Sequence, residues 1–286
     1  LSLPAILLLL VGASGPLLIV LVYSFLKPGD FSGVVWEPSF KAWFQILFSK
    51  DIFDDTIGLA DARLTIFWRS VRLSLMTTVI TLVLGLPTAY FIATRSGRQR
   101  TFWLFLITIP FWTSYLIRVF LWKVILGYKG VLNTGLMHLG VITEPLSSLI
   151  YNVNAVIITL AHSWAAFAIL PLFVSLEKLD RSLLEAAADL GDGPIRRFLR
   201  ITLPLTMPGI IAALMIVMIP TVGDYVTPKL VGGKDGVMIA NAIQVQFGRA
   251  SNWPLGAALA VSTMIIVSLV AGTIVLALAG LKRLLK

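Results

Sequence analysis

Six long apolar segments dominate this sequence and limit what the chain can fold into. They cover residues 3–26, 67–94, 102–126, 153–177, 205–223 and 255–281. A helix that crosses a bilayer needs roughly 20 mostly apolar residues, and each segment meets this length. Apolar residues make up 58% of the chain and charged residues only 13%, whereas a soluble domain carries about 25% charge. We therefore expect an all-α membrane protein with six transmembrane helices, and a soluble enzyme is excluded.

The basic residues predict how these helices are oriented. Lys and Arg are dense in three stretches that follow the second, fourth and sixth segments, and they are sparse in the other connections. The dense stretches contain Arg95, Arg98, Arg100, Lys178, Arg181, Arg196, Arg197, Arg200, Lys282, Arg283 and Lys286. Basic connections stay on the cytoplasmic side, so both termini are predicted to be cytoplasmic. This asymmetry also explains the net charge of +9 without a nucleic-acid partner.

The charge pattern and the apolar segments together divide the chain into three parts. Residues 1–66 would form the first transmembrane helix and a long outer loop. Residues 67–281 would form a core of five transmembrane helices, and residues 282–286 a cytoplasmic tail.

The connection between the fourth and fifth segments, residues 179–204, is too polar to cross a membrane and too regular for a plain loop. Ser182 and Glu185 have the spacing of a capping box, and the three alanines that follow favour a helix. Gly191 suits a left-handed helix end, and Pro194 suits the first position of a new helix. We predict two short cytoplasmic helices separated by a tight glycine corner.

Two interpretations of this connection stay open. The first helix would carry an apolar stripe of Leu183, Leu184, Ala187 and Leu190, and the second a basic face of Arg196, Arg197 and Arg200. A basic amphipathic helix can lie on anionic headgroups, where each basic residue contributes about 1 kcal/mol. The run of alanines instead permits close approach by another protein surface, which favours a docking helix.

The same connection contains a complete family signature. Glu185-Ala186-Ala187 is followed after three residues by Gly191 and after nine more by Ile201-Thr202-Leu203-Pro204. This pattern resembles the EAA signature of permease subunits of binding-protein-dependent ABC importers, the MetI-like superfamily, and the resemblance covers about residues 67–281. Other runs resemble the spermidine/putrescine branch of these permeases. They are Pro110–Ser114 with Arg118, Glu177–Asp180, Gly223–Pro228, Met238–Asn241 and Asn252–Gly256.

The resemblance implies a role in a larger assembly. In such importers two permease subunits enclose the pathway, two ATP-binding subunits lie beneath them, and a periplasmic or lipid-anchored protein delivers the solute. The chain would be a multi-pass protein of the bacterial inner membrane, in contact with membrane lipid, and its second permease would be a paralogue. A polyamine such as spermidine or putrescine is the implied solute, while an opine or an amino acid derivative stays open.

The resemblance also implies which residues couple the permease to ATP hydrolysis. The EAA segment would be the coupling helix that docks on the ATPase subunit. The docking element would consist of Glu185, Ala186, Ala187 and Gly191, flanked by Arg196 and Arg197.

No nucleotide-binding or catalytic motif is found in the sequence itself. The Gly-Gly-Lys run at residues 232–234 is followed by Asp235, and position 228 is Pro, so it departs from the phosphate-binding loop. The chain has no Cys and only two His, so no metal site is predicted. We expect no catalytic residue and no cofactor bound by this chain, with ATP and Mg bound by the partner ATPase subunits.

Two charged residues in the apolar segments are candidates for the solute pathway, because ionisable residues in a membrane are costly and point to function. Arg118 is about 16 residues into the third segment, which corresponds to roughly 24 Å along a continuous helix and places it in the outer half. Asp224 ends the fifth segment at a similar depth, beside Tyr225. Helical spacing puts Phe111, Tyr115, Arg118 and Trp122 on one face.

These residues have two interpretations. One is an outer aromatic belt with a snorkelling arginine. The other is that the outer pathway or its gate is formed by Trp112, Tyr115, Arg118, Asp224 and Tyr225. Aromatic faces and a carboxylate suit a polyamine, but Arg118 would repel one, so a pair of Arg118 with Asp224 could close the gate instead.

Two other classes of protein are less well supported. A self-contained secondary transporter leaves the EAA segment unexplained, and the sequence lacks a recognisable inverted repeat. An intramembrane enzyme is disfavoured because the sequence contains neither a GxSxG nor an HExxH motif.

Overall fold

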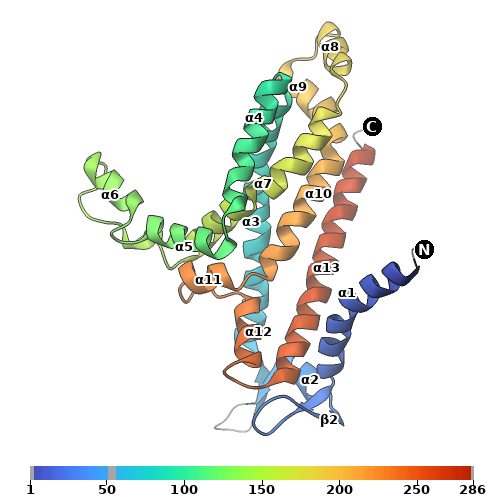
Figure 1. Cartoon of the computed structure of the whole chain (residues 1–286), viewed down its shortest axis with the longest axis vertical. Helices are drawn as coiled ribbons and strands as arrows, with labels where there is room; N and C mark the ends of the chain where they lie inside the picture. Colours follow the sequence, from blue (N-terminus) through green and yellow to red (C-terminus); the bar gives the residue numbers. More distant parts are fainter. Residues whose placement is uncertain (1–2, 51–55, 285–286) are drawn as a thin grey trace. The chain divides into compact units, whose positions relative to one another are not determined.

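The computed structural model describes residues 3–50 and 56–284, and most of them are helical (Figure 1). The chain divides into two compact units. The first unit contains the described residues up to Val71 together with Gly223–Tyr225 and Val237–Ser268. The second contains Arg72–Val222, Val226–Gly236 and the described residues from Leu269 onward. Two long helices, α3 (Asp61–Ala93) and α13 (Trp253–Leu284), contribute residues to both units.

The first unit contains the N-terminal helix and the segment that was expected to be a long loop. Its elements are α1 (Leu3–Tyr23), the antiparallel pair β1 (Leu26–Pro28) and β2 (Val34–Pro38), α2 (Lys41–Leu47), and the antiparallel pair β3 (Phe48–Lys50) and β4 (Ile57–Leu59). The rings of Phe25 and Trp43 stack at 5.4 Å, and Trp43 Nε1 donates to Ser24 Oγ. The outer segment therefore contains packed structure, although its residues 51–55 lie outside the described part.

The first unit also contains α12 (Ile239–Phe247), which comes from the far end of the sequence. The N–H of Ile239 donates to Ser70 Oγ on α3 at 2.7 Å. Asn241 Nδ2 donates to the carbonyl of Tyr225 at 2.8 Å. The first bond joins residues 169 positions apart, and the second joins α12 to a segment 16 positions before it.

The second unit is a helical bundle. After α3, its elements are α4 (Gly97–Thr108), η1 (Ile109–Trp112), α5 (Tyr115–Leu126), α6 (Val131–His138), η2 (Ser147–Leu149), α7 (Val153–Glu177), α8 (Arg181–Asp189), α9 (Pro194–Arg197), η3 (Phe198–Thr202), α10 (Leu203–Val222) and α11 (Val226–Val231). Here η1 and η2 are short 3-10 helices, and η3 is a π-helical turn.

The core of this unit lies where α7 packs along α10 and against the end of α3 (Figure 1). Ile92, Leu172 and Val217 are among its fully buried members. Lipid tails are as apolar as these side chains, so close packing rather than exclusion of water holds such helices together. Gly209 makes the closest approach possible, because a Cβ there would lie 2.4 Å from Ser175 Oγ.

Among the described residues, four helices are long and apolar enough to cross a membrane. They are Asp61–Ala93, Val153–Glu177, Pro194–Val222 and Trp253–Gly280. The predicted boundaries of the fourth segment, 153–177, coincide with those of α7. In the first predicted segment, residues 14–23 form an apolar helix that is shorter than a crossing. The six crossings and the cytoplasmic termini therefore stay predictions.

The segment predicted to cross the membrane over residues 102–126 is a bent pair of helices rather than one straight helix. The chain bends by 90° between the helical run that ends at Trp112 and the one that begins at Tyr115. Pro110 lacks the N–H that would extend α4, and Thr113 is extended with φ −94° and ψ 149°. Counting this bent pair as one span raises the crossings in the described part of the chain to five.

Candidate coupling site

The helix that contains the EAA segment, α8, is capped by Asp180. The Asp180 backbone is extended, and its Oδ1 accepts the backbone N–H of Ser182 at 3.0 Å. This hydrogen bond lowers the pKa of the Asp180 carboxyl below its ordinary value. A carboxylate is also favoured by the partial positive charge of a helix N-terminus. The predicted capping box with Ser182 as N-cap is therefore wrong, because Ser182 already lies in the first turn.

The C-terminal end of α8 is a two-bond turn at Gly191. The Gly191 N–H donates to the carbonyl of Ala188, and the Asp192 N–H donates to the carbonyl of Ala187, both at 2.9 Å. Gly191 has φ +86°, a value at which an L side chain is strained. This is the Schellman arrangement, and the predicted left-handed glycine end is confirmed.

The helix after the corner does not end where it was expected to end. α9 begins at Pro194, as predicted, with Gly193 before it. It then continues through η3 into α10, so that one helix runs from Pro194 to Val222. The prediction of a separate second short helix is wrong, since residues 195–201 contain neither a glycine nor a capping residue that would end it. The glycine corner thus joins α8 directly to the fifth predicted span.

The residues of the EAA segment differ in exposure. Glu185 and Ala186 are exposed, whereas Ala187 is buried. The predicted apolar stripe is therefore divided, because Leu190 at its end is 88% exposed. Ile195, just beyond the corner, is 75% exposed. Leu190 and Ile195 therefore add apolar surface to the exposed side of the corner.

The predicted basic face is divided as well. Arg196 is exposed, but Arg197 Nη1 donates to the carbonyl of Leu184 on α8 at 3.4 Å. Arg200 Nη1 lies 3.7 Å from Asp192 Oδ1. Arg197 therefore braces the corner between α8 and α9, whereas Arg196 and Arg200 are both exposed to solvent and Arg200 makes only a long surface ion pair.

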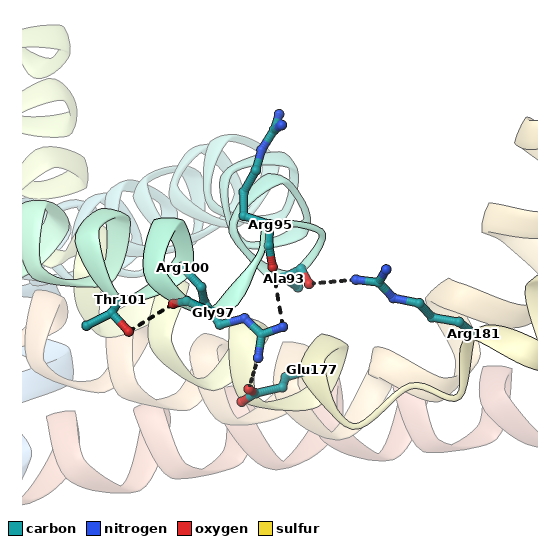
Figure 2. Close-up of polar contacts among 7 residues, drawn as sticks. All are labelled: Ala93, Arg95, Gly97, Arg100, Thr101, Glu177 and Arg181. Carbon is teal, nitrogen blue, oxygen red and sulfur yellow. Dashed lines mark hydrogen bonds and ion pairs between the residues drawn. The ribbon is translucent and has the colours of Figure 1, made fainter.

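A pocket of about 290 Å³ lies under α8, and its walls come from α3, α4, α7, α8 and the start of the α9–α10 helix. Glu185 lines it together with Arg181. Figure 2 shows two charged contacts at this pocket. Arg100 and Glu177 form an ion pair between α4 and α7, and Arg181 Nη2 donates to the carbonyl of Ala93 at 3.3 Å. The pocket is thus bordered by charged contacts as well as by apolar side chains.

Sequence reasoning assigned no site role to Arg100, Glu177 or Arg181. It used Arg100 and Arg181 only as cytoplasmic positive charges, and Glu177 only as part of a family run. Arg100 and Glu177 are 77 positions apart, so no local spacing could have paired them.

The candidate pathway residues fall into two groups. Arg118 is buried, and its guanidinium lies 4.7 Å from the centre of the Phe111 ring and 5.8 Å from that of Tyr115. Arg118 Nη1 also donates to the carbonyl of Ser163 at 3.4 Å. These three predicted neighbours therefore meet, although the helix between them is broken. The distance of 24 Å assumed a straight helix through Thr113, which the bend removes, so the place of Arg118 in the outer half stays a prediction.

The other pathway candidates are placed differently. Tyr115 Oη is hydrogen-bonded to Thr227 Oγ1 on α11 at 2.7 Å. Trp112 is 81% exposed. Asp224 is buried and Tyr225 is 45% exposed, and both belong to the first unit, whereas Arg118 belongs to the second. The pair of Arg118 with Asp224 stays a prediction.

The chain is similar to known transport proteins in sequence. Residues 82–282 match the family described as binding-protein-dependent transport system inner membrane component. The spermidine/putrescine transport system permease protein PotB of Escherichia coli is 44% identical over 200 residues, which cover 70% of this chain and 72% of PotB. PotB of Haemophilus influenzae is 41% identical over 204 residues, 71% of each chain. The inner membrane ABC transporter permease protein YdcU of Escherichia coli is 31% identical over 268 residues, 89% of this chain and 81% of YdcU.

The fold is also found among solved structures. A bacterial ABC transporter involved in the import of the acidic polysaccharide alginate matches with a TM-score of 0.63 and 18% identity, over 98% of this chain and 93% of that chain. A bacterial alginate ABC transporter in complex with a periplasmic protein bound to an alginate pentasaccharide matches with a TM-score of 0.62, over 98% and 92%. The family match includes α8, its corner and α10. This multi-pass chain therefore belongs to the inner membrane components of binding-protein-dependent ABC transport systems, as its EAA segment indicated.

Proposed function

We propose that this chain is the permease subunit of an ABC importer for a polyamine such as spermidine or putrescine. The observation that carries the proposal is its 44% identity over 200 residues to PotB, whose name gives these two solutes. An opine or an amino acid derivative is the alternative solute within the same superfamily. A secondary transporter is disfavoured because it has no ATP-binding subunit on which the capped and exposed helix α8 could dock.

In this proposal the chain crosses the inner membrane six times. α1 and the bent pair of α4 and α5 add two crossings to the four long helices, and both termini are cytoplasmic. Residues 1–66 supply the first crossing and the outer segment, residues 67–281 the permease core, and residues 282–286 the cytoplasmic end. The chain pairs with a paralogous permease, two ATP-binding subunits, and a periplasmic or lipid-anchored solute-binding protein. ATP and Mg bind to the ATP-binding subunits, which carry the catalytic residues.

The role of α8 is to couple the permease to these ATP-binding subunits. Its exposed end, with Leu190 and Ile195, supplies apolar contact area, and Ala186 permits close approach. The turn at Gly191 fixes the angle between α8 and the helix that follows. Because that helix runs without a break to Val222, a displacement of α8 is carried into the membrane as a tilt of α10.

The outer pathway or gate is assigned to Trp112, Tyr115, Arg118, Asp224 and Tyr225. If the two charges form the predicted pair, neutralising Arg118 or Asp224 alone leaves the other charge without that partner and is expected to reduce transport. Exchanging the two charges in a double variant tests direct pairing, since only a direct pair is restored by the exchange.

Co-purification from the native membrane tests the coupling assignment. Wild type is compared with Glu185→Lys and Gly191→Asp, and Lys178→Gln is the control because Lys178 is an exposed cation close to α8 in sequence. Mass spectrometry is expected to find an ATP-binding subunit and a second permease with wild type and the control, and to find less of the ATP-binding subunit with both variants. A wild-type chain that purifies alone and transports solute without ATP would refute the proposal.

The solute is tested separately in proteoliposomes that contain the complete importer and its binding protein. ATP-dependent uptake of labelled spermidine or putrescine is expected. Uptake of an opine or an amino acid derivative in place of both polyamines would keep the importer assignment and overturn the polyamine assignment.

A further inference from the structure

The coupling helix α8 is fastened to the second unit mainly by polar contacts. Ala187 is the buried residue of α8 among those described, so the helix contributes little to the packed core. The pocket of about 290 Å³ lies beneath it. The covalent connections of α8 are the turn from α7 and the glycine corner to α9. Side-chain contacts around the pocket therefore decide which other helices move with α8.

Arg181 makes such a contact. It is the first residue of α8, and its guanidinium donates to the carbonyl of Ala93, the last residue of α3 (Figure 2). A carbonyl at a helix C-terminus lacks a partner within its own helix and carries partial negative charge. The Arg181 guanidinium supplies this carbonyl with both a hydrogen-bond donor and a positive charge. This contact joins two elements that are 88 positions apart in the chain.

A second charged contact joins neighbouring helix ends close to the bond from Arg181 to Ala93. Arg100, near the start of α4, pairs with Glu177, the last residue of α7. The other terminal nitrogen of Arg100 donates to the carbonyl of Arg95, just beyond the end of α3, at 3.5 Å. The ends of α3, α4 and α7 are therefore held together beside the point where Arg181 attaches α8 (Figure 2).

We propose that Arg181 is a positioning residue that transmits the displacement of α8 to α3, and that Arg100 and Glu177 keep α4 and α7 aligned with that movement. The inference rests on the proposed function of α8 as the coupling helix. It adds a second route into the membrane, because α3 is a candidate span distinct from the α9–α10 helix. Without Arg181, α8 can still dock on the ATP-binding subunit, but its movement reaches only the helices joined to it by the chain.

The test uses the complete importer in proteoliposomes with its loaded binding protein. Arg181→Gln removes the charge, Arg181→Lys keeps the charge without the fork of donors, and Lys178→Gln is the matched control. Three quantities are measured: the ATP-binding subunit retained on purification, the ATP hydrolysed, and the solute transported per ATP. Arg181→Gln is expected to retain the ATP-binding subunit and to transport about tenfold less solute per ATP, the effect of losing one hydrogen bond to a charged group. Arg181→Lys should fall between, and the control should match wild type.

The outcomes separate this inference from the proposed function. If Arg181→Gln transports as much solute per ATP as wild type, this inference is wrong and the proposed function is unaffected. Loss of the ATP-binding subunit from this variant also overturns it, because Arg181 would then be a docking residue. Failure of the wild-type chain to retain an ATP-binding subunit overturns the proposed function and the inference with it.

A covalent tether between α8 and the end of α3 gives an independent test, because it restores the connection in a chain that lacks the Arg181 guanidinium. The chain contains no cysteine, so cysteines introduced at Thr94 and Arg181 can be joined selectively by a short bis-maleimide. Both positions line the pocket. Before crosslinking, the double variant should show the reduced ratio of solute to ATP, and crosslinking should restore most of it. A tether that forms without restoring the ratio contradicts the proposed route through α3.

Discussion

The contact between α7 and α10 gives a sharp test of the packing. Gly209→Ala places a Cβ 2.4 Å from Ser175 Oγ and 2.6 Å from the carbonyl oxygen of Pro171. The serine oxygen can rotate away, but the backbone carbonyl cannot. Ordinary contacts need roughly 3.5 Å or more, so the two helices must separate by close to 1 Å at this point. Overpacking of this kind costs about 1–3 kcal/mol.

Gly85→Ala is the matched control, because Gly85 is also a buried helical glycine that faces α7. A Cβ there would lie 3.5 Å from the side chains of Ile169 and Leu172, an ordinary contact. Both variants gain the same preference of alanine for a helix, about 1 kcal/mol in water, and it cancels in the comparison. Unfolding in mixed micelles by increasing sodium dodecyl sulfate should therefore find Gly209→Ala less stable than Gly85→Ala by about 1–3 kcal/mol. Equal stabilities would refute the close approach of α7 and α10.

Three further predictions follow from single contacts. Gly191→Ala should destabilise the end of α8 by about 1–2 kcal/mol because of the positive φ. Amide hydrogen exchange at the end of α8 should become faster. Gly193→Ala, at φ −69°, should have little effect on this exchange. Because the pKa of Asp180 is lowered in the folded protein, its cap is intact above the ordinary value of 3.8 and is lost as pH falls through the lower folded value. Protection of the first-turn amides of α8 from hydrogen exchange should decrease over that pH range. The decrease should be absent in Asp180→Asn, which does not titrate. Tyr115→Phe should cost about 1 kcal/mol in the same micelle assay by removing its bond to α11, while Tyr128→Phe, at an exposed position, should cost little.

Local signals in the sequence predicted a helix boundary where a single residue determines it. The end of α8 was predicted in this way from Gly191. The start of α7 was predicted from the apolar run alone, and the structure shows that the side chain of Asn152 caps the helix there. The size of the bend at residues 113–114 was not predicted, because apolar composition continues through it and does not indicate the direction of the chain. Asp180 and Ser182 both have capping side chains, so the choice between them depends on backbone geometry that the sequence does not reveal.

The contacts that hold the candidate site together lie beyond local signals. The pair of Arg100 with Glu177 and the bond from Arg181 to Ala93 each join helices that only the fold brings together. Arg197 was expected on the basic face of the second short helix, yet it turns back to α8. Each of these arginines fits the predicted excess of basic residues on the cytoplasmic side. That excess does not indicate which acceptor each arginine contacts.

The π-helical turn over Phe198–Thr202 has a consequence for insertions and deletions. A π turn contains about one more residue than an α turn, and each α-helical residue corresponds to about 100° of rotation. Both kinds of turn complete about 360°, so removing one residue here and closing the turn to α geometry would leave the Pro194 end in nearly the same direction relative to α10. Removing one residue from the regular α-helical part of α10 would instead rotate the Pro194 end by roughly 100°, and the glycine corner and α8 would then aim in a new direction even if every side chain in the site were kept. The π turn should therefore accept the loss of one residue more readily than the α-helical part of α10 that follows it.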